Sequence, residues 1–561
     1  MLTTVAVVAL VASTGAGLAK TKHKPAPAAD TTMSSPSSPS SPAMAANGPS
    51  NAELAARIDS LQAELAAAED HRNADHGRLS ALEQNFNDTS WTFDNARPTV
   101  KSGDGRFTMA FRVRFQSDFA GFMQDTPAPV VAPATLPANR DLSSGAVIRR
   151  AYFGVEGKVF NDFNYELRLN GGGTDGGNNG ASGVPNGGEG DPLVNKAVLT
   201  YVGIPHWHLN VGVIEPAFMF EGTTSSASLM FLERPEIDNI AADTFGAGDS
   251  RRGVELGFQH TDLFWSGDNL AVTGAFTGGK TGSTANHGNG GDENTQVLGR
   301  ISDRLWTDGV QSNFQIGASG AEVLYSGTAA GGATQTLRFR DRPEIRVDGT
   351  RLIDTGGINA KTGHMWALDA GGNIDNFFLG GEYASFTMDR QCAGGILTVA
   401  NAPQCANAAH TAIDGTKVFD HPTSSGFYVE GSWVITGEAK QYSPGAINNE
   451  VGGFNAPVPS APFSFSGGSW GAWELAVRYS DTDLDFHDTQ VSSTSLLPGI
   501  NGGDEKIIAI ALNWYLNRNI RVMLDDNIVH VQKGGVGTTA AVLNHDNQDL
   551  NIVGIRVQFA N

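Results

Sequence analysis

The sequence predicts an all-β protein, a transmembrane antiparallel β-barrel of about sixteen strands preceded by a short N-terminal coiled-coil helix. Apolar and polar residues alternate with a period of two through much of the chain, as in strands with one apolar face. Charged side chains fall on the polar face of many of these strands, where a dry core would leave them unpaired but water would hydrate them. Connections alternate between short and long, a pattern typical of barrels that cross a membrane.

Composition agrees with this class and excludes others. The chain has 561 residues, of which 40% are hydrophobic, and no internal run reaches the roughly 20 apolar residues that a membrane-crossing helix needs. The net charge of -21 excludes a nucleic-acid partner, which would need a basic surface. No set of nucleophile, base and oxyanion-stabilising residues and no zinc-ligand spacing stands out, so we expect neither an enzyme nor a cofactor.

The first 87 residues differ from the rest of the chain. Residues 1–19 have the apolar core and small-residue end of a secretory leader, although no Lys or Arg precedes Lys20, and a membrane anchor is the alternative. Residues 20–49 are rich in Pro, Ser and Ala and are expected to form a disordered linker. Residues 50–87 are expected to form an oligomerising periplasmic coiled coil, because apolar residues recur at heptad-like spacing, namely Leu54, Ile58, Leu61 and Leu65.

The barrel is expected over residues 90–561. Counting every β-like run gives seventeen, an odd number that would put the two termini on opposite sides of the membrane. The run 334–346 contains Pro343, which a central strand resists, so we assign it to a long inward-folded loop near 327–360. Sixteen strands then remain, with both termini periplasmic and a second inward-folded loop near 216–250.

The predicted connections include one that the short-long rule does not explain. Short turns are expected at 160–162, 203–206, 370–374 and 516–519. The stretch 441–467 is long, yet strand counting places it on the periplasmic side with the short turns.

Two cysteines, Cys392 and Cys405, lie close together in a stretch rich in Gly, Ala and Asn. In an oxidising periplasm they are candidates for a disulfide, which would stabilise the fold by roughly 3 kcal/mol. Two free thiols are the alternative.

Several motifs resemble the phosphate-selective porin O/P family of outer-membrane porins. They include Glu-Pro-Ala-Phe-Met-Phe-Glu-Gly-Thr-Thr-Ser-Ser at 215–226, Asp-Ser-Arg-Arg-Gly at 249–253 and, most strongly, Gly-Ala-Trp-Glu-Leu-Ala-Val-Arg-Tyr at 471–479. The resemblance extends from about residue 90 to the C-terminus. It implies a sixteen-stranded homotrimer in the outer membrane of a Gram-negative bacterium, with inward-folded loops and basic residues that draw anions through the pore.

The candidate pore-lining residues are cationic side chains on the polar face of the strands and in the two inward-folded loops. Guanidinium groups stay charged and pair with anionic oxygens, so they can attract anions without dehydrating them in one step. We expect about half to be neutralised by carboxylates. The candidates are Arg112, Arg114, Arg150, Lys158, Arg168, Lys196, Arg300, Arg478, Arg521 and Arg556 on strands, and Arg234, Arg251, Arg252, Arg338, Arg340, Arg342 and Arg346 in the loops.

These observations predict a porin for passive diffusion of small hydrophilic solutes. Lysines are scarce on the polar face, where only Lys158 and Lys196 occupy mid-strand positions, so we expect a mild anion preference with phosphate as a candidate solute. The expected partners are two further copies of the chain, outer-membrane lipid and small anions. A surface adhesin or binding protein with an exported β-domain is the alternative function.

Overall fold

The computed structural model describes ten stretches of the chain, and every structural statement below refers to them. They are residues 50–124, 142–173, 193–248, 250–280, 294–326, 336–392, 418–443, 453–486, 500–534 and 545–561. The predicted leader and linker and Cys405 lie outside them, so the leader, the linker and the disulfide stay predictions.

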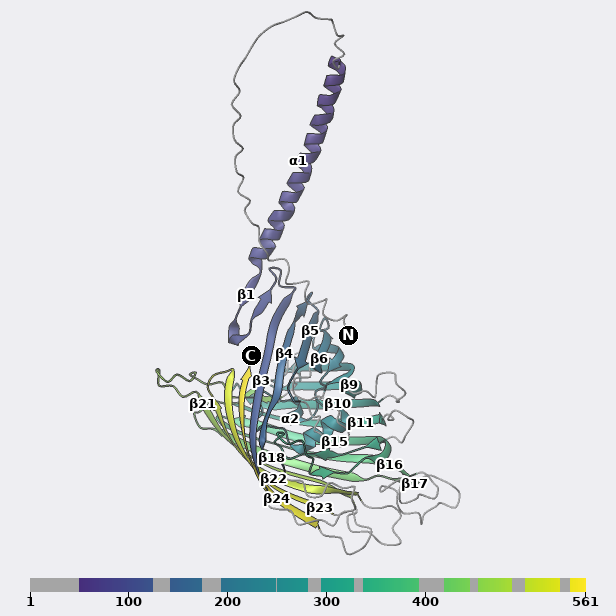
Figure 1. Cartoon of the computed structure of the whole chain (residues 1–561), viewed down its shortest axis with the longest axis vertical. Coiled ribbons are helices and arrows are strands. Elements are labelled where there is room, and N and C mark those ends of the chain that lie inside the picture. The colour runs from purple at the N-terminus through teal and green to yellow at the C-terminus, as the bar shows by residue number, and fades with distance from the viewer. Residues whose placement is uncertain are drawn as a thin grey trace, which may run out of the picture. The chain divides into compact units, whose positions relative to one another are not determined.

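Sixteen antiparallel strands close into a barrel, which confirms the predicted architecture (Figure 1). Each strand pairs with the next in order along the chain, and the last pairs with the first, with Phe559 opposite Phe115. The strands are β3 (Thr108–Gln124), β4 (Gly145–Val159), β5 (Phe163–Asn170), β6 (Leu193–Tyr201), β7 (Trp207–Ile214), β8 (Arg251–Thr261), β9 (Asn269–Lys280), β10 (Asn294–Asp308), β11 (Ser312–Ser326), β15 (Ile358–Ile374), β16 (Phe377–Cys392), β18 (Thr423–Val434), β21 (Ala472–Phe486), β22 (Ile500–Tyr515), β23 (Ile520–Gly534) and β24 (His545–Ala560).

The two faces of the barrel wall have the reverse of the polarity found in a soluble protein. On β21, the apolar Val477 and Leu475 are 47% and 38% exposed on the outer face. Their neighbours Glu474 and Arg478 are 0% and 1% exposed inside the barrel. Alternation thus puts apolar side chains toward lipid and charged ones toward the interior, as in a transmembrane barrel.

One predicted turn is wrong. The sequence 370–374 belongs to β15, and the turn to β16 consists of residues 375 and 376, with Asp375 at φ 51°. The glycines that suggested a turn instead allow close packing, because a Cβ at Gly371 would lie 2.5 Å from the Phe220 ring and one at Gly372 2.6 Å from the Asn313 carbonyl oxygen.

The N-terminal region of the described chain consists of α1 (Asn51–Asp88), followed by β1 (Ser90–Thr92), a 3-10 turn η1 (Asp94–Ala96) and β2 (Thr99–Lys101), which pairs with β3. A capping box starts α1: the Glu53 N–H donates to Ser50 Oγ at 3.3 Å, and the Ser50 N–H donates to Glu53 Oε2 at 2.9 Å. Of the described helices, none is both long and apolar enough to cross a membrane. The coiled coil itself stays a prediction.

Three connections pack inside the barrel. The first, which we call loop 215–250, contains α2 (Phe220–Thr223), α3 (Glu236–Ile240) and the π-helical turn η2 (Ala241–Phe245). The second, loop 327–357, joins β11 to β15 and holds β12 (Thr336–Leu337), β13 (Arg340–Asp341) and β14 (Ile353–Asp354).

A short strand outside these connections, β17 (Val418–Asp420), pairs with the end of β16.

The third connection, segment 435–471, explains the long stretch that the short-long rule left open. It contains the paired strands β19 (Gln441–Ser443) and β20 (Gly453–Asn455). Phe454 is 3% exposed and lies 6.1 Å from the ring of Phe220 in loop 215–250 and 5.1 Å from Phe378 of β16. The segment is long because it enters the barrel and packs against loop 215–250.

Candidate functional site

Bonds to its backbone hold loop 215–250 on the barrel wall, and several of them come from β22 and β23. Arg521 and Asn513 donate to the carbonyl oxygens of Leu229 and Met230 at 2.7 and 2.8 Å. The Leu232 N–H donates to Asp525 at 2.7 Å. Because these partners lie on β22 and β23, residues 229–232 of the loop are fixed to that part of the wall.

A cavity of about 180 Å³ lies between the loops and strands β3–β8. Its lining side chains include ten cationic groups and five carboxylates, so the local charge is positive although the chain is acidic overall. The cationic groups are Arg114, Arg149, Arg150, Arg168, Lys196, Arg234, Arg340, Arg342, Arg346 and Arg351.

A β-bulge in β4 places two consecutive arginines inside the barrel. Gln116 of β3 pairs with Arg150, but the next residue, Ser117, pairs with Ile148, so Arg149 is an extra residue. Arg149 and Arg150 are 8% and 5% exposed and both line the cavity. Strict alternation predicted only Arg150. The signal available in the sequence was the polar doublet at 149–150, which interrupts the period of two.

A second bulge does the same in β6. Arg168 of β5 pairs with Lys196, and Leu169 pairs with Val194, which leaves Asn195 as the extra residue. Asn195 accepts a hydrogen bond from Arg168 at 2.5 Å and donates to Ser250 at 2.8 Å. Both bulges therefore add a polar side chain at the level of the cavity while leaving the lipid face of the strand apolar.

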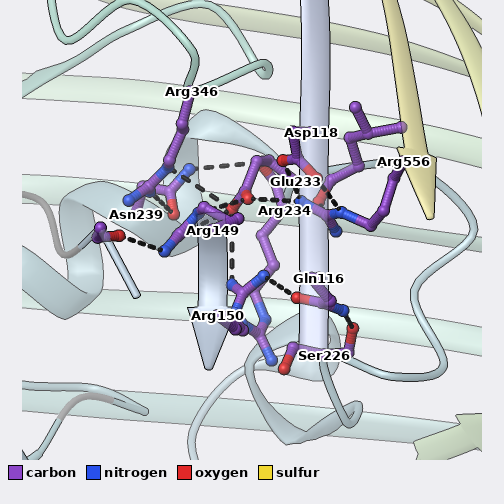
Figure 2. Close-up of polar contacts among 12 residues, drawn as sticks. Gln116, Asp118, Arg149, Arg150, Ser226, Glu233, Arg234, Asn239, Arg346 and Arg556 are labelled. Carbon is purple, nitrogen blue, oxygen red and sulfur yellow. Dashed lines mark hydrogen bonds and ion pairs between the residues drawn. The ribbon is translucent and has the colours of Figure 1, made fainter. Parts of the chain in front are cut away.

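Four guanidinium groups converge on the carboxylate of Glu233 in loop 215–250 (Figure 2). Arg149 Nε and Arg556 lie 2.6 and 3.0 Å from Oε1, whereas Arg150 and Arg346 lie 3.5 Å from Oε2. These positive charges outweigh the effect of burial and hold the pKa of Glu233 well below its ordinary value.

The other predicted cations that line the cavity have contacts of several kinds. Arg114 donates to Ser225 at 2.9 Å, and Arg234 donates to the carbonyl oxygens of Glu221 and Thr224 at 2.8 and 2.6 Å. Arg168 pairs with Glu215, and Lys196 lies 3.2 Å from Glu166. Some cavity cations are thus paired with carboxylates, and others have neutral hydrogen-bond acceptors among their partners.

The arginines of loop 327–357 gather near its contact with loop 215–250. Arg340 lies 3.2 Å from Asp243, and Arg346 donates to Asn239. Arg342 is 3% exposed. Burial, together with Arg342 and Arg340, lowers the pKa of Arg351 to about 10. Arg338 instead pairs with Asp354 and is not among the cavity-lining residues.

Several predicted pore residues lie elsewhere in the interior, in ion pairs that attach the loops or join two strands of the wall. Arg300 pairs with Asp369 at 2.6 Å, and Arg112 with Glu156 at 3.0 Å. Arg478 donates through Nε to Glu344 of loop 327–357 at 3.0 Å, and Arg556 pairs with Asp118 at 2.6 Å.

The remaining predicted residues also lie outside the cavity lining. Lys158 is exposed near the short-turn end of β4. Arg251 binds the carbonyl oxygens of Ala242 and Asp243, and so ties the end of loop 215–250 to β8. Arg252 lies two residues before Val254 on β8, and Val254 is 42% exposed on the outer face. The alternation of the strand therefore places Arg252 on the outer face as well.

Comparison with known proteins assigns a family. The family model for phosphate-selective porin O and P matches residues 133–560. No curated protein matches the chain. Solved structures that are similar include the outer membrane channel DcaP of Acinetobacter baumannii, with 11% identity, a TM-score of 0.41, and 82% of this chain and 99% of that chain covered.

Two further structures are similar over a comparable length. The anion-selective porin from Comamonas acidovorans has 11% identity and a TM-score of 0.37, covering 81% of this chain and 100% of that chain. OmpT, an outer membrane protein of Vibrio cholerae, has 9% identity and a TM-score of 0.40, covering 81% and 98%.

Proposed function

Because the chain belongs to the phosphate-selective porin O and P family and is thus an outer-membrane porin, we propose that it is a passive pore with a mild preference for small anions. The observation that carries the proposal is the charge of the cavity lining, where cationic side chains outnumber carboxylates ten to five. A narrow space with such a lining raises the local concentration of anions and lowers that of cations.

The proposed mechanism is electrostatic, with no bond made or broken. An anion entering the cavity would exchange water for N–H donors of Arg114, Arg168 and Lys196 on the wall, and of Arg340 and Arg342 on the loop. Because guanidinium donors are spread along the path, the anion passes from one to the next without losing its whole hydration shell at once.

The preference is expected to be mild because the lining also carries its own anions. Glu215 and Glu233 already bind several of the arginines, and Asp243 lies close to Arg340. Lys196 is the only lysine among the residues that line the cavity. Phosphate is therefore a candidate solute, but the local charges favour weak and rapid exchange over tight capture.

We also propose that the working form is a homotrimer in outer-membrane lipid, exported through the leader 1–19 and assembled with the help of α1. The apolar heptad residues of α1 support a role in assembly, since Leu61 and Leu65 are 56% and 61% exposed in the single chain. A single-chain particle mass for the protein in mild detergent would contradict the trimer.

The test of the function is a planar-bilayer recording with unequal KCl on the two sides. We expect conductance steps and a reversal potential on the anion side, close to zero because selectivity is mild. Adding inorganic phosphate to the chloride solution then tests phosphate as a solute, with competition expected only at high concentration. A reversal potential on the cation side would overturn the anion preference, and an absence of conductance steps would overturn the pore.

A further inference from the structure

Segment 435–471, which enters the barrel through β19 and β20, ends in a hairpin that we call hairpin 460–471. Ser464 and Ser469 pair across it through two backbone hydrogen bonds of 2.9 and 3.2 Å. The Phe463 N–H donates to the Leu516 carbonyl oxygen at 2.6 Å. The hairpin is therefore closed by its own bonds and attached to the short turn between β22 and β23.

Aromatic rings join the hairpin to the outer face of the barrel wall. The Phe463 ring lies 5.1 Å from the Trp514 ring of β22, and the Trp514 Nε1–H donates to the Trp470 carbonyl oxygen at 2.7 Å. Trp514 stacks at 5.2 Å on Trp473, its partner in the register of β21. Because Trp473 lies two residues before the outward-facing Leu475, both stacked rings belong to the lipid side of the strands. The hairpin thus continues the lipid-facing surface at the short-turn end.

The hairpin exposes aromatic side chains and has no charged group. Phe465 at its tip is 86% exposed, and Trp470 is 60% exposed. Residues 456–473 contain no Asp, Glu, Lys, Arg or His, although 17% of the chain is charged. An exposed apolar patch on an attached hairpin indicates an interaction surface. Aromatic rings among uncharged residues match the boundary between lipid headgroups and acyl chains.

The lengths of the neighbouring strands favour lipid over a second copy of the chain as the partner of this surface. β21 and β22 have 15 and 16 residues, more than the about 9–11 that a tilted strand needs to cross a bilayer. β5 and β7 have only eight residues each, so lipid would cover them least well. Neither is a neighbour of β21 or β22 in the ring.

We propose that hairpin 460–471 is a lipid anchor, whose Phe465 and Trp470 side chains enter the interfacial layer of the leaflet at the short-turn end of the barrel. Transfer of the two rings from water to this layer removes apolar area from water and stabilises the inserted state. The anchor explains why this connection is long on the side of the short turns. It concerns how the barrel is held in the membrane and does not depend on which solute passes.

The test places a photo-reactive side chain at the tip, in Phe465→p-benzoylphenylalanine, and uses barrels reconstituted in vesicles of phosphatidylethanolamine and phosphatidylglycerol. After illumination, mass spectrometry identifies what the tip contacts. We expect protein whose mass has increased by one phospholipid. A cross-linked pair of chains would overturn the proposal in favour of a second copy, and the absence of any adduct would overturn it in favour of water.

The matched control carries the same photo-reactive side chain in place of Phe86, a phenylalanine of α1 that is 80% exposed. We expect no lipid adduct there, because α1 precedes the barrel and its proposed partner is another chain. Equal lipid adducts at both positions would contradict the anchor, since any exposed position would then react with lipid. Heat-modifiable migration on a gel checks that each variant forms the barrel. If the Phe465 variant does not, the same side chain in place of Trp470 gives the same readings.

A second measurement compares two substitutions at the tip by urea titration in the same vesicles. Phe465→Asp brings a charge into the interfacial layer, so the ratio of folded to unfolded barrel should fall at least about tenfold, or about 1.4 kcal/mol. Phe465→Leu keeps the tip apolar and should stay within about twofold of the wild type. A tip in water tolerates both changes, so equal ratios for the two variants would contradict the lipid contact.

Discussion

The two faces of loop 215–250 meet opposite kinds of charge. On the face toward β3–β8, the cavity is lined mainly by arginines. On the other face, buried carboxyl groups gather at α2, α3 and the wall: Glu221, Glu236, Asp238, Glu382, Glu430 and Glu505 are each 4% exposed or less. The loop therefore separates a cationic solute space from a solvent-poor acidic layer.

The acidic layer is stable because its carboxyl groups do not all need to be charged. Burial, together with the charge of Glu505, raises the pKa of Glu236 well above its ordinary value. Burial, with a smaller contribution from Glu221, raises the pKa of Asp238 to about 8. A protonated carboxyl can donate to its neighbour, so the acidic face can bury Glu236 and Asp238 in neutral form, whereas the cavity face carries charged arginines.

The largest effect is expected from breaking the attachment on the acidic face with Arg478→Ala. Arg478 is 1% exposed and binds Glu344 and the Glu233 carbonyl oxygen. Its removal leaves a buried carboxylate without its cation, which should lower the free energy of unfolding by about 3–5 kcal/mol in urea titration. As the control, Arg338→Ala breaks a pair in which Arg338 is 42% exposed, and should cost less than about 1 kcal/mol. Equal losses would show that burial does not distinguish the two attachments.

A smaller effect is expected when the acidic face is titrated. Between its ordinary pKa of 3.8 and about 8, Asp238 is protonated in the folded loop but ionised in the unfolded chain. The folded state then binds more protons, so the stability that Asp238 contributes falls as pH rises through this window and changes no further above it. The temperature at which the heated barrel changes to its unfolded migration on a gel should fall from pH 5 to pH 8. It should fall less steeply in Asp238→Asn.

The pKa of Asp238 depends on the charged groups around its carboxyl. Glu221 on α2 disfavours its charge, whereas Arg234 and Arg478 favour it. Asp243→Asn, on the cavity face of the same loop, serves as the control and should keep the wild-type slope. A wild-type slope in Asp238→Asn would assign the pH dependence to other groups.

The smallest effect is expected from changing one charge on the cavity face with Arg168→Gln. A unit charge acts on an ion about 10 Å away in water with about 0.4 kcal/mol, so the local anion concentration should fall roughly two-fold. The reversal potential in a KCl gradient should move toward the cation side, helped by the release of Glu215. Arg106→Gln changes the same charge outside the cavity and should leave the potential unmoved; a matching shift there would mean that selectivity follows net charge alone.

Much of the barrel could be predicted from the sequence because lipid imposes a simple rule on every strand. The alternation around Arg478 gave the correct face, and Pro343 correctly removed 334–346 from the wall. The turn at 370–374 was misplaced because glycines chosen for close packing look like glycines chosen for a turn.

The cavity could be predicted less well. The alternation of side chains along a strand identifies which residues face inward, but not which of those residues contact a loop. Arg300 and Arg168 have the same parity, yet Arg300 is bound to Asp369 away from the cavity and Arg168 lines it. Arg149 was missed because a bulge depends on pairing with the neighbouring strand, which a single sequence does not display.

The bulges at Arg149 and Asn195 suggest how such a pore could change its solute during evolution. Substitution of an inward-facing residue exchanges one side chain for another and leaves the number of side chains in the barrel interior unchanged. Insertion of one residue in a strand adds a side chain to the interior, while the membrane-facing residues below it keep their places. Related pores could thus differ by single-residue insertions in the strands that line the cavity. A comparison of the lengths of these strands would reveal the added lining residues, which a comparison of residue identities at aligned positions would miss.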